Sequence, residues 1–343
     1  MNTAEGIDRD LAGLLQCPRD LADLIADGKN LRCAHGHHYP VVDGIPVLLL
    51  EEHEPTLGVA TASLKAAQSR VGGPLYVDTL GIPDELKRRV EQDWTAEAKV
   101  DAVISYLVGA TSGRGYVNAI GRLRDYPIPD IPIGSGNGEL LLDVGSSWGR
   151  WSVSAARKGW RVVGLDPSLG AILAAKRAFS RLGLDVTFVC GDARFMPFKA
   201  ESFDCVFSYS VIQHFCEADA ARALAETSRV LRRGGFAKIQ MAHKGGLRAI
   251  YSRTRRSYVK SGRFRVRYWS LAALREVFES KIGPSKLFAE AFGGLGLLSE
   301  DRDFVSRKAR ALIALSTALK KLSMYGVPLL RLADSVYVVS QKR

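Results

Sequence analysis

Residues 140–149, with the sequence LLLDVGSSWG, decide the fold class of this chain. Three leucines in succession are typical of a strand that is buried on both faces, as in a parallel sheet. Asp143, Gly145 and Gly149 follow, and a helical pattern then runs from about residue 150 to residue 158. A strand, a glycine-bearing turn and a helix in this order let the backbone approach a ligand closely at the N-terminus of the helix.

Further apolar segments along the chain end in polar residues in the same way. Val162 and Val163 begin a predicted strand that ends in Asp166, where an acidic side chain typically accepts hydrogen bonds from ribose hydroxyls. The next predicted strand, 186–190, is followed by Gly191-Asp192-Ala193, and a carboxylate there can accept from an adenine amino group. A fourth strand, 205–208, opens into Tyr209 and the start of a helix. The polar residues therefore gather at one edge of a doubly wound α/β sheet.

The acid that precedes the first glycine separates this turn from a dinucleotide-binding turn. The loop is Asp-Val-Gly-Ser-Ser-Trp-Gly and not Gly-x-Gly-x-x-Gly. Asp143 would repel a pyrophosphate at this place. The pocket therefore suits a ligand that has a positively charged end and no phosphates.

Over about residues 138–243 these ordered motifs resemble the class I S-adenosylmethionine-dependent methyltransferases, in particular the type-11 subgroup that includes quinone-biosynthesis enzymes. The resemblance implies a Rossmann-like fold with a doubly wound, seven-stranded, mostly parallel sheet. It also implies that S-adenosyl-L-methionine is the cofactor. A methyltransferase of this kind places acceptor oxygen, methyl carbon and sulfur in line, and positioning supplies most of its effect.

The resemblance also implies roles for individual residues. Asp143 would bind the methionine amino group, and Asp166 would bind the ribose hydroxyls. Asp192 with Ala193 would contact the adenine, and the backbone carbonyl of Ser208 would accept from the amino group. The other positions expected around the cofactor are Gly145, Ser146, Ser147, Gly149, Pro167 and Tyr116. Many family members have glycine where this chain has Ser147, but serine is small enough to leave the pocket open. The alternative for Asp143 or Asp192 is a carboxylate that caps a helix or a turn.

Methyl transfer to a hydroxyl requires a group that takes the proton of the acceptor. His214 lies where this subgroup often has a histidine that faces the cavity, and it is the first candidate for the base. His243, at the end of the strand predicted over 237–241, is the second candidate. For both residues the alternative interpretation is a structural histidine.

Residues 11–50 are predicted to form a small β-rich module that precedes the core. Cys17-Pro18-Arg19-Asp20 and Cys33-Ala34-His35-Gly36-His37 repeat the layout of a small zinc-binding module. The module resembles the methyltransferase-activator family and the zinc ribbon that precedes a ribosomal RNA guanine methyltransferase core. This resemblance implies the zinc ligands Cys17, Asp20, Cys33 and His37, with Asp20 in the place of the usual second cysteine. The alternative is a degenerate module that keeps the fold without the metal, because carboxylate is a less common ligand of structural zinc.

The rest of the chain divides around the predicted core domain, 138–343. Residues 51–137 are predicted as a linker with one short helix, over 51–80, and a helical extension. The closing strand is placed at 336–340, which leaves residues 244–334 as an insertion that forms a substrate lid. The segment 244–267 contains nine basic residues and no acid, so it is either a site for the phosphates of RNA or lipid or a solvated surface. An apolar stripe on a helix near 305–322 indicates packing against the core or peripheral contact with a membrane.

Composition sets the remaining expectations. The chain has 343 residues, 47% of them hydrophobic and 24% charged, and a net charge of +12, which is ordinary for a globular protein apart from the basic excess. The polar first residues predict no signal peptide, no apolar run predicts a membrane span, and five cysteines without a framework pattern indicate a cytoplasmic protein. The predicted function is methylation of a small-molecule or glycan-like acceptor on oxygen. The alternatives are RNA methylation and a non-catalytic protein that binds the cofactor.

Overall fold

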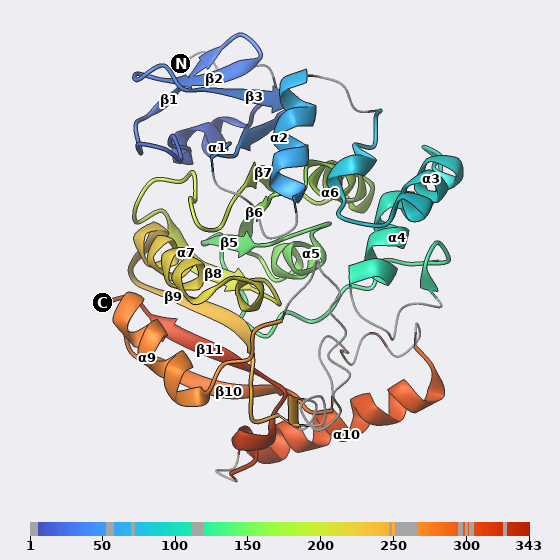
Figure 1. Cartoon of the computed structure of the whole chain (residues 1–343), viewed down its shortest axis with the longest axis vertical. Coiled ribbons are helices and arrows are strands. Elements are labelled where there is room, and N and C mark those ends of the chain that lie inside the picture. Colours follow the sequence, from blue (N-terminus) through green and yellow to red (C-terminus); the bar gives the residue numbers. More distant parts are fainter. Residues whose placement is uncertain are drawn as a thin grey trace.

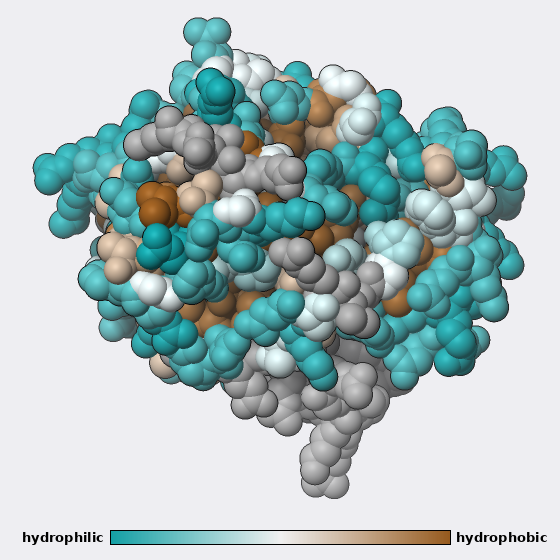
Figure 2. All heavy atoms as spheres, turned by 90° about the horizontal axis from the view of Figure 1, so that it is seen from above, coloured by the Kyte–Doolittle hydropathy of each residue, from teal (hydrophilic) through white to brown (hydrophobic). Residues whose placement is uncertain are grey.

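The computed structural model describes residues 6–52, 58–69, 73–111, 119–246, 249–250, 266–293, 298, 301, 305–324 and 328–343. One continuous sheet runs through this part of the chain, with helices on both of its faces (Figure 1). Figure 1 places the N-terminal strands and the long helix α10 (Arg307–Ser323) at opposite ends of the molecule. The face seen in Figure 2 is covered mostly by hydrophilic side chains.

The strands of the sheet follow the order β1-β2-β3-β4-β7-β6-β5-β8-β9-β11-β10. Their bounds are β1 (Leu24–Asp27), β2 (Asn30–Cys33), β3 (His38–Val42), β4 (Ile45–Leu48), β5 (Leu140–Val144), β6 (Arg161–Asp166), β7 (Thr187–Gly191), β8 (Phe203–Ser208), β9 (Leu231–Ala242), β10 (Ser285–Ala291) and β11 (Ser335–Gln341). The six strands from β4 to β9 in this order are parallel, and β11 is antiparallel to both of its neighbours. The parallel strands are buried on both faces, as their apolar runs predict.

Helices cover both faces of the sheet. The helix bounds are α1 (Arg9–Leu14), α2 (Val59–Ser69), α3 (Asp84–Asp93), α4 (Ala102–Thr111), α5 (Arg150–Arg157), α6 (Leu169–Leu182), α7 (Glu217–Val230) and α9 (Leu271–Lys281). Helices α1, α7 and α9 pack in one apolar cluster with one face of the sheet. The opposite face packs against α5 and α6, and α2 and α4 add to that layer. None of the helices in the described ranges has the length and apolar character needed to cross a membrane.

The described residues form one sheet of eleven strands, of which residues 138–343 contribute seven, β5 to β11. The prediction of a separate β-rich module is corrected, because β1 to β4 continue this sheet. The edge strand of the module, β4, pairs in parallel with β7, with Val47 opposite Cys190 and Leu48 opposite Gly191. All four residues of β4 are buried. The N-terminal strands therefore extend the sheet of the core.

The segment 51–80 is also more than the predicted linker. Helix α2 buries Ala60, Leu64 and Ala67 in a cluster with β4 and α6. Small alanine side chains carry a weak periodic signal, but they let a helix pack closely against its neighbours.

The predicted insertion 244–334 contains part of the sheet layer itself. Helix α9 begins after its cap Ser270 and leads into β10, which pairs with β11. The closing strand predicted over 336–340 is β11, which lies between β9 and β10. The prediction that residues 244–334 form one continuous lid is therefore wrong, because α9 and β10, within residues 271–291, belong to the sheet and its helix layer.

Candidate active site

The loop between β5 and α5 has a backbone that few side chains tolerate. Gly145 and Gly149 have φ of +76° and +82°. A Cβ atom on Gly145 would lie 2.1 Å from Cγ2 of Val211, and one on Gly149 would lie 2.6 Å from Phe179. The two glycines therefore allow both the turn and the close approach of neighbouring side chains. Ser147 between them has φ of +49°, where a non-glycine residue is uncommon.

Asp143 lies at the end of β5 and is buried, with 1% of its surface exposed. The hydroxyl of Ser152 donates a hydrogen bond of 2.6 Å to its Oδ2. Burial raises the pKa of the Asp143 carboxyl to about 7. A cationic ligand at this place would reverse that effect, because an opposite charge favours the ionised carboxylate.

Asp166 ends the neighbouring strand β6. Its Oδ2 accepts from the backbone N–H of Ser147 and its Oδ1 accepts from that of Ser168, both at 2.9 Å. Burial raises the pKa of the Asp166 carboxyl to about 6, and these two bonds oppose the rise. The first bond holds the left-handed Ser147 in place. An ionised carboxylate has about four acceptor positions, so two remain for ligand hydroxyls.

Asp192 follows β7 and is held by an arginine that the sequence motifs do not single out. Arg194 donates from its backbone N–H at 2.8 Å and from its guanidinium at 2.6 Å. The same guanidinium lies 3.3 Å from Asp219 at the start of α7. Arg194 therefore fixes the position of the Asp192 carboxylate. This contact is compatible with both interpretations of Asp192, a residue that stabilises a turn and a residue that contacts a ligand.

Four other expected cofactor contacts surround this region. Ser208 ends β8, and its hydroxyl donates to the carbonyl of Val144, which joins β8 to β5. The Oγ of Ser146 is buried and has no hydrogen-bond partner within the described residues. Ala193 is buried beside Asp192, and Pro167 precedes the cap of α6.

The two candidate bases have different surroundings. His214 is half-buried in the short helix Ile212–His214, four residues after the end of β8. His243 is 5% exposed, and its Nδ1 lies 2.9 Å from the carbonyl oxygen of Ala333. Burial lowers the pKa of His243, so the ring is neutral, and the carbonyl contact makes Nδ1 the donor. These contacts favour a structural role for His243.

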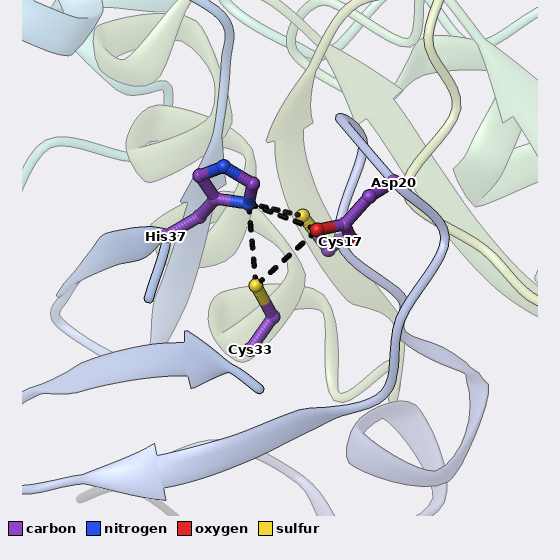
Figure 3. A group of neighbouring side chains, drawn as sticks. All are labelled: Cys17, Asp20, Cys33 and His37. Atoms are coloured by element: carbon purple, nitrogen blue, oxygen red, sulfur yellow. Dashed lines mark hydrogen bonds and ion pairs between the residues drawn. The ribbon is translucent and has the colours of Figure 1, made fainter. Parts of the chain in front are cut away.

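The ligand atoms of four side chains in the N-terminal module converge (Figure 3). Nδ1 of His37 lies 3.5 Å from Sγ of Cys17, 3.3 Å from Sγ of Cys33 and 3.0 Å from Oδ2 of Asp20. Sγ of Cys33 lies 3.6 Å from the same Asp20 oxygen. All four ligand atoms lie within 4.8 Å of one another. The sequence placed these residues in one cluster, and the structure brings them together.

The comparison with protein families gives one match. Residues 141–235 match the family described as methyltransferase domain, and they cover β5 to the first part of β9. This segment is a methyltransferase domain. The carboxylates Asp143, Asp166 and Asp192 all lie within it.

Curated relatives share this domain over part of their length. A biotin biosynthesis bifunctional protein of Cellvibrio japonicus is 34% identical over 50% of this chain and 30% of its own length. A demethylmenaquinone methyltransferase of Thermobifida fusca is 38% identical over 29% of this chain and 42% of its own length. A ubiquinone biosynthesis O-methyltransferase of Brucella anthropi is 31% identical over 29% of this chain and 40% of its own length. The chain spans less than half the length of each of these relatives.

A similar solved structure is a methyltransferase of Thermotoga maritima described as a possible histamine N-methyltransferase. It is 20% identical, with a TM-score of 0.40, and the match covers 62% of this chain and 84% of that one.

Sequence reasoning missed some residues that shape the methyltransferase domain, and other predicted residues lie outside the described part. Ser152 holds the carboxylate of Asp143, and Arg194 holds that of Asp192. Neither residue belongs to a recognised motif, and the only signal in the sequence is that they lie close to Gly149 and Asp192. Tyr116 lies outside the described residues, and so do Arg253, Arg255 and Arg256 of the basic segment.

Proposed function

We propose that this chain transfers a methyl group from S-adenosylmethionine to a hydroxyl oxygen of a small-molecule or glycan-like acceptor. One observation carries the proposal: a buried carboxylate, Asp143, and a partly buried one, Asp166, end adjacent parallel strands beside a left-handed glycine loop. An ammonium group and a pair of ribose hydroxyls match these carboxylates, whereas a phosphate does not. The methyltransferase domain at 141–235 supports methyl transfer, and the relative named as a ubiquinone biosynthesis O-methyltransferase supports oxygen as the acceptor atom.

The residues of the chain would bind and orient the reactants. When bound, S-adenosylmethionine supplies an electrophilic methyl group on a sulfonium sulfur. Asp143 would hold the ammonium end, Asp166 the ribose and Asp192 the adenine amino group. A bond forms from the acceptor oxygen to the methyl carbon as the carbon–sulfur bond breaks, and the hydroxyl proton passes to a base, for which we propose His214. The products are the methyl ether and neutral S-adenosylhomocysteine.

Calorimetric titration with S-adenosylhomocysteine tests the cofactor site. We expect saturable binding to the full chain and a loss of roughly tenfold or more in affinity for Asp166→Asn, because a carboxylate that binds hydroxyls is lost. Asp185→Asn is the matched control, since Asp185 is exposed just before β7. The absence of binding by the unmodified chain would contradict the proposal.

Incubation with radiolabelled S-adenosylmethionine and fractionated cell extract tests the acceptor class. We expect label in a small-molecule or glycan fraction, unchanged by nuclease treatment. Label that nuclease removes would instead show RNA methylation. Cofactor binding without any labelled product would show a non-catalytic protein.

We also propose that Cys17, Asp20, Cys33 and His37 hold a structural zinc ion. With zinc–sulfur bonds of about 2.3 Å and zinc–nitrogen or zinc–oxygen bonds of about 2.0–2.2 Å, tetrahedral neighbours lie about 3.3–3.8 Å apart. Three of the four distances between ligand atoms fall in that range, and the His37–Asp20 distance of 3.0 Å is slightly shorter. The backbone N–H of Ala22 donates to the other oxygen of Asp20 at 3.0 Å, which orients this unusual ligand. Four protein ligands leave no open position, so zinc here would stabilise the fold.

Metal analysis of the purified full chain tests the zinc proposal. We expect one zinc per chain in the unmodified protein and loss of the metal in Cys33→Ser. Cys216→Ser is the matched control, because Cys216 is a free cysteine exposed at the start of α7. Equal metal content in both variants, or none in the unmodified chain, would contradict the proposal.

A further inference from the structure

A cavity of about 230 Å³ is lined by residues of α10 and of the sheet. Figure 1 places α10 at the end of the molecule farthest from the N-terminal strands. Helix α10 contributes Ile313, Ser316 and Lys320 to its wall. Across the cavity lie Trp151 of α5, Glu290 of β10 and Tyr337 of β11. An apolar cavity of about 150 Å³ is enough to bind benzene. This cavity therefore has room for a substituted six-membered ring.

The cavity has one buried acid. Glu290 is 4% exposed, and its Oε1 and Oε2 accept from the hydroxyls of Tyr209 at 3.2 Å and Ser335 at 2.5 Å. Two bonds use about half of the acceptor positions of an ionised carboxylate. Burial raises the pKa of Glu290, and a donor from a ligand would stabilise its charged form. This wall therefore favours a ligand that brings a hydroxyl.

Aromatic rings form a second wall of the cavity. The ring of Tyr209 lies 4.7 Å from that of Trp151 and 6.2 Å from that of Tyr337, between ring centres. Ile313 and Leu298 add apolar surface. The two ring pairs are tilted, by 42° and 52°, and aromatic side chains with aliphatic neighbours are a typical lining for a planar ring.

The cavity also has a cation. Lys320 lies with its Nζ 5.9 Å from the centre of the Tyr337 ring, and its charge also acts on the carboxyl of Glu290 and opposes the rise of that pKa. Lys238 approaches the same ring at 4.9 Å. An anionic substituent on the ligand would supply Lys320 with a partner of opposite charge.

The cavity adjoins the cofactor loop through α5 and β8. Gly149 caps α5, and Trp151 in the first turn of that helix lines the cavity. Tyr209 directly follows Ser208, so the residue that holds Glu290 also neighbours an expected cofactor contact. Arg150 forms an ion pair of 3.1 Å with the fully buried Asp301, which receives the backbone N–H of the cavity residue Leu298. Cofactor loop and cavity therefore share the first turn of α5.

We propose that this cavity binds an aromatic acid that carries a ring hydroxyl, with the hydroxyl at Glu290, the ring between Trp151 and Tyr337, and the carboxylate at Lys320. That this ligand is the methyl acceptor rests on the function proposed above, and in that case Glu290, which lines the cavity, would take the hydroxyl proton in place of His214. The ring contacts provide affinity, and the two charged residues select the substituents.

Calorimetric titration of the full chain with three related probes tests the proposal. 4-Hydroxybenzoate carries both substituents, benzoate lacks the hydroxyl, and 4-hydroxybenzyl alcohol lacks the carboxylate. We expect 4-hydroxybenzoate to bind roughly tenfold more tightly than benzoate, because a hydrogen bond to a buried carboxylate is lost. We expect it to bind roughly threefold more tightly than the alcohol, because Lys320 is partly exposed.

Variants assign each difference to a residue. Glu290→Gln should remove the preference for 4-hydroxybenzoate over benzoate, and Lys320→Met should remove the preference over the alcohol. Lys321→Met is the matched control, since Lys321 is the exposed neighbour on the same helix, and it should leave both preferences unchanged. If Glu290→Gln fails to fold, the three probes on the unmodified chain still decide the question.

Two outcomes overturn the inference: equal affinity for all three probes, or no saturable binding of any of them, which would mean that the cavity holds only water. S-Adenosylhomocysteine is titrated into the same preparations. If it binds while the probes do not, this inference fails and the proposed function stands. If the probes bind while S-adenosylhomocysteine does not, the proposed function fails and the cavity remains a ligand site.

Discussion

Asp143 opposes stability in the free protein, because burial raises its pKa from 3.8 to about 7. The folded chain then holds this proton more tightly than the unfolded chain, so its contribution to stability is greatest below about pH 4 and falls as the pH rises to about 7. Asp143→Asn removes that dependence. We expect the variant without ligand to unfold with a free energy on the order of 2–4 kcal/mol higher at about pH 8, and with a similar value at about pH 4.

Urea denaturation at the two pH values measures this change, and calorimetry measures the accompanying loss of S-adenosylhomocysteine binding. Asp185→Asn serves again as control, and it should change neither quantity. A variant that is less stable than the unmodified chain at about pH 8 would show that the ionised Asp143 does not lower the free energy of unfolding.

Gly145 separates the effect of backbone conformation from that of close packing. Gly145→Ala combines a φ of +76° with a Cβ that would lie 2.1 Å from Val211, whereas Gly183→Ala has a φ of +64° and open space around the Cβ. The control should lose about 1 kcal/mol from conformation alone. We expect Gly145→Ala to lose about 1–3 kcal/mol more by urea denaturation. Equal losses would mean that Val211 moves aside freely.

At the scale of elements, the start of α6 joins the cofactor site to the segment before it. Ser168 accepts from the backbone N–H of Ala171 at 3.2 Å, and its hydroxyl donates to the carbonyl of Thr79 at 2.8 Å. Ser168→Ala should lower the free energy of unfolding by about 1–2 kcal/mol, because it removes a cap and leaves a buried carbonyl without its donor. Ser306→Ala, which removes only the cap of α10, should lose less. Thermal unfolding compares the two, and a larger loss for Ser306→Ala would contradict this account.

The elements that the sequence predicted well are those with long apolar runs. β5, β6, β7, β8 and β11 follow such runs, and the polar residues at the ends of β5 and β6 meet as expected. β10 was hidden in the predicted insertion because its first four residues alternate between half-buried and exposed, and Phe288 is exposed while Glu290 is buried. That reversal of polarity is what places an acid in the cavity, and no periodic pattern signals it.

At the scale of the whole molecule, the joining of the N-terminal strands to the core could not be predicted. The pairing of β4 with β7 joins residues far apart in the sequence. From the sequence alone, β4 could equally be the edge strand of a separate N-terminal sheet, and β7 the edge strand of the core sheet. Backbone bonds from Gln16 to the carbonyl of Pro197 and from Lys199 to that of Leu14 strengthen the same junction. Cys17, the next residue along, belongs to the proposed zinc site. Because Gln16 bonds to Pro197, the proposed zinc site lies next to the segment that follows Asp192.

This continuity predicts that the N-terminal strands and the methyltransferase domain unfold together. The five tryptophans all lie outside residues 6–52, so their fluorescence reports on the rest of the chain. Leu31→Ala, which truncates a buried side chain of β2, should nevertheless shift the fluorescence transition in urea by about 2–4 kcal/mol. Ile25→Ala in the neighbouring strand β1 is the matched control, because Ile25 is 54% exposed, and it should leave the transition in place. If Leu31→Ala alters circular dichroism but not tryptophan fluorescence, the N-terminal strands unfold independently, because one cooperative unit would give coincident transitions with both probes.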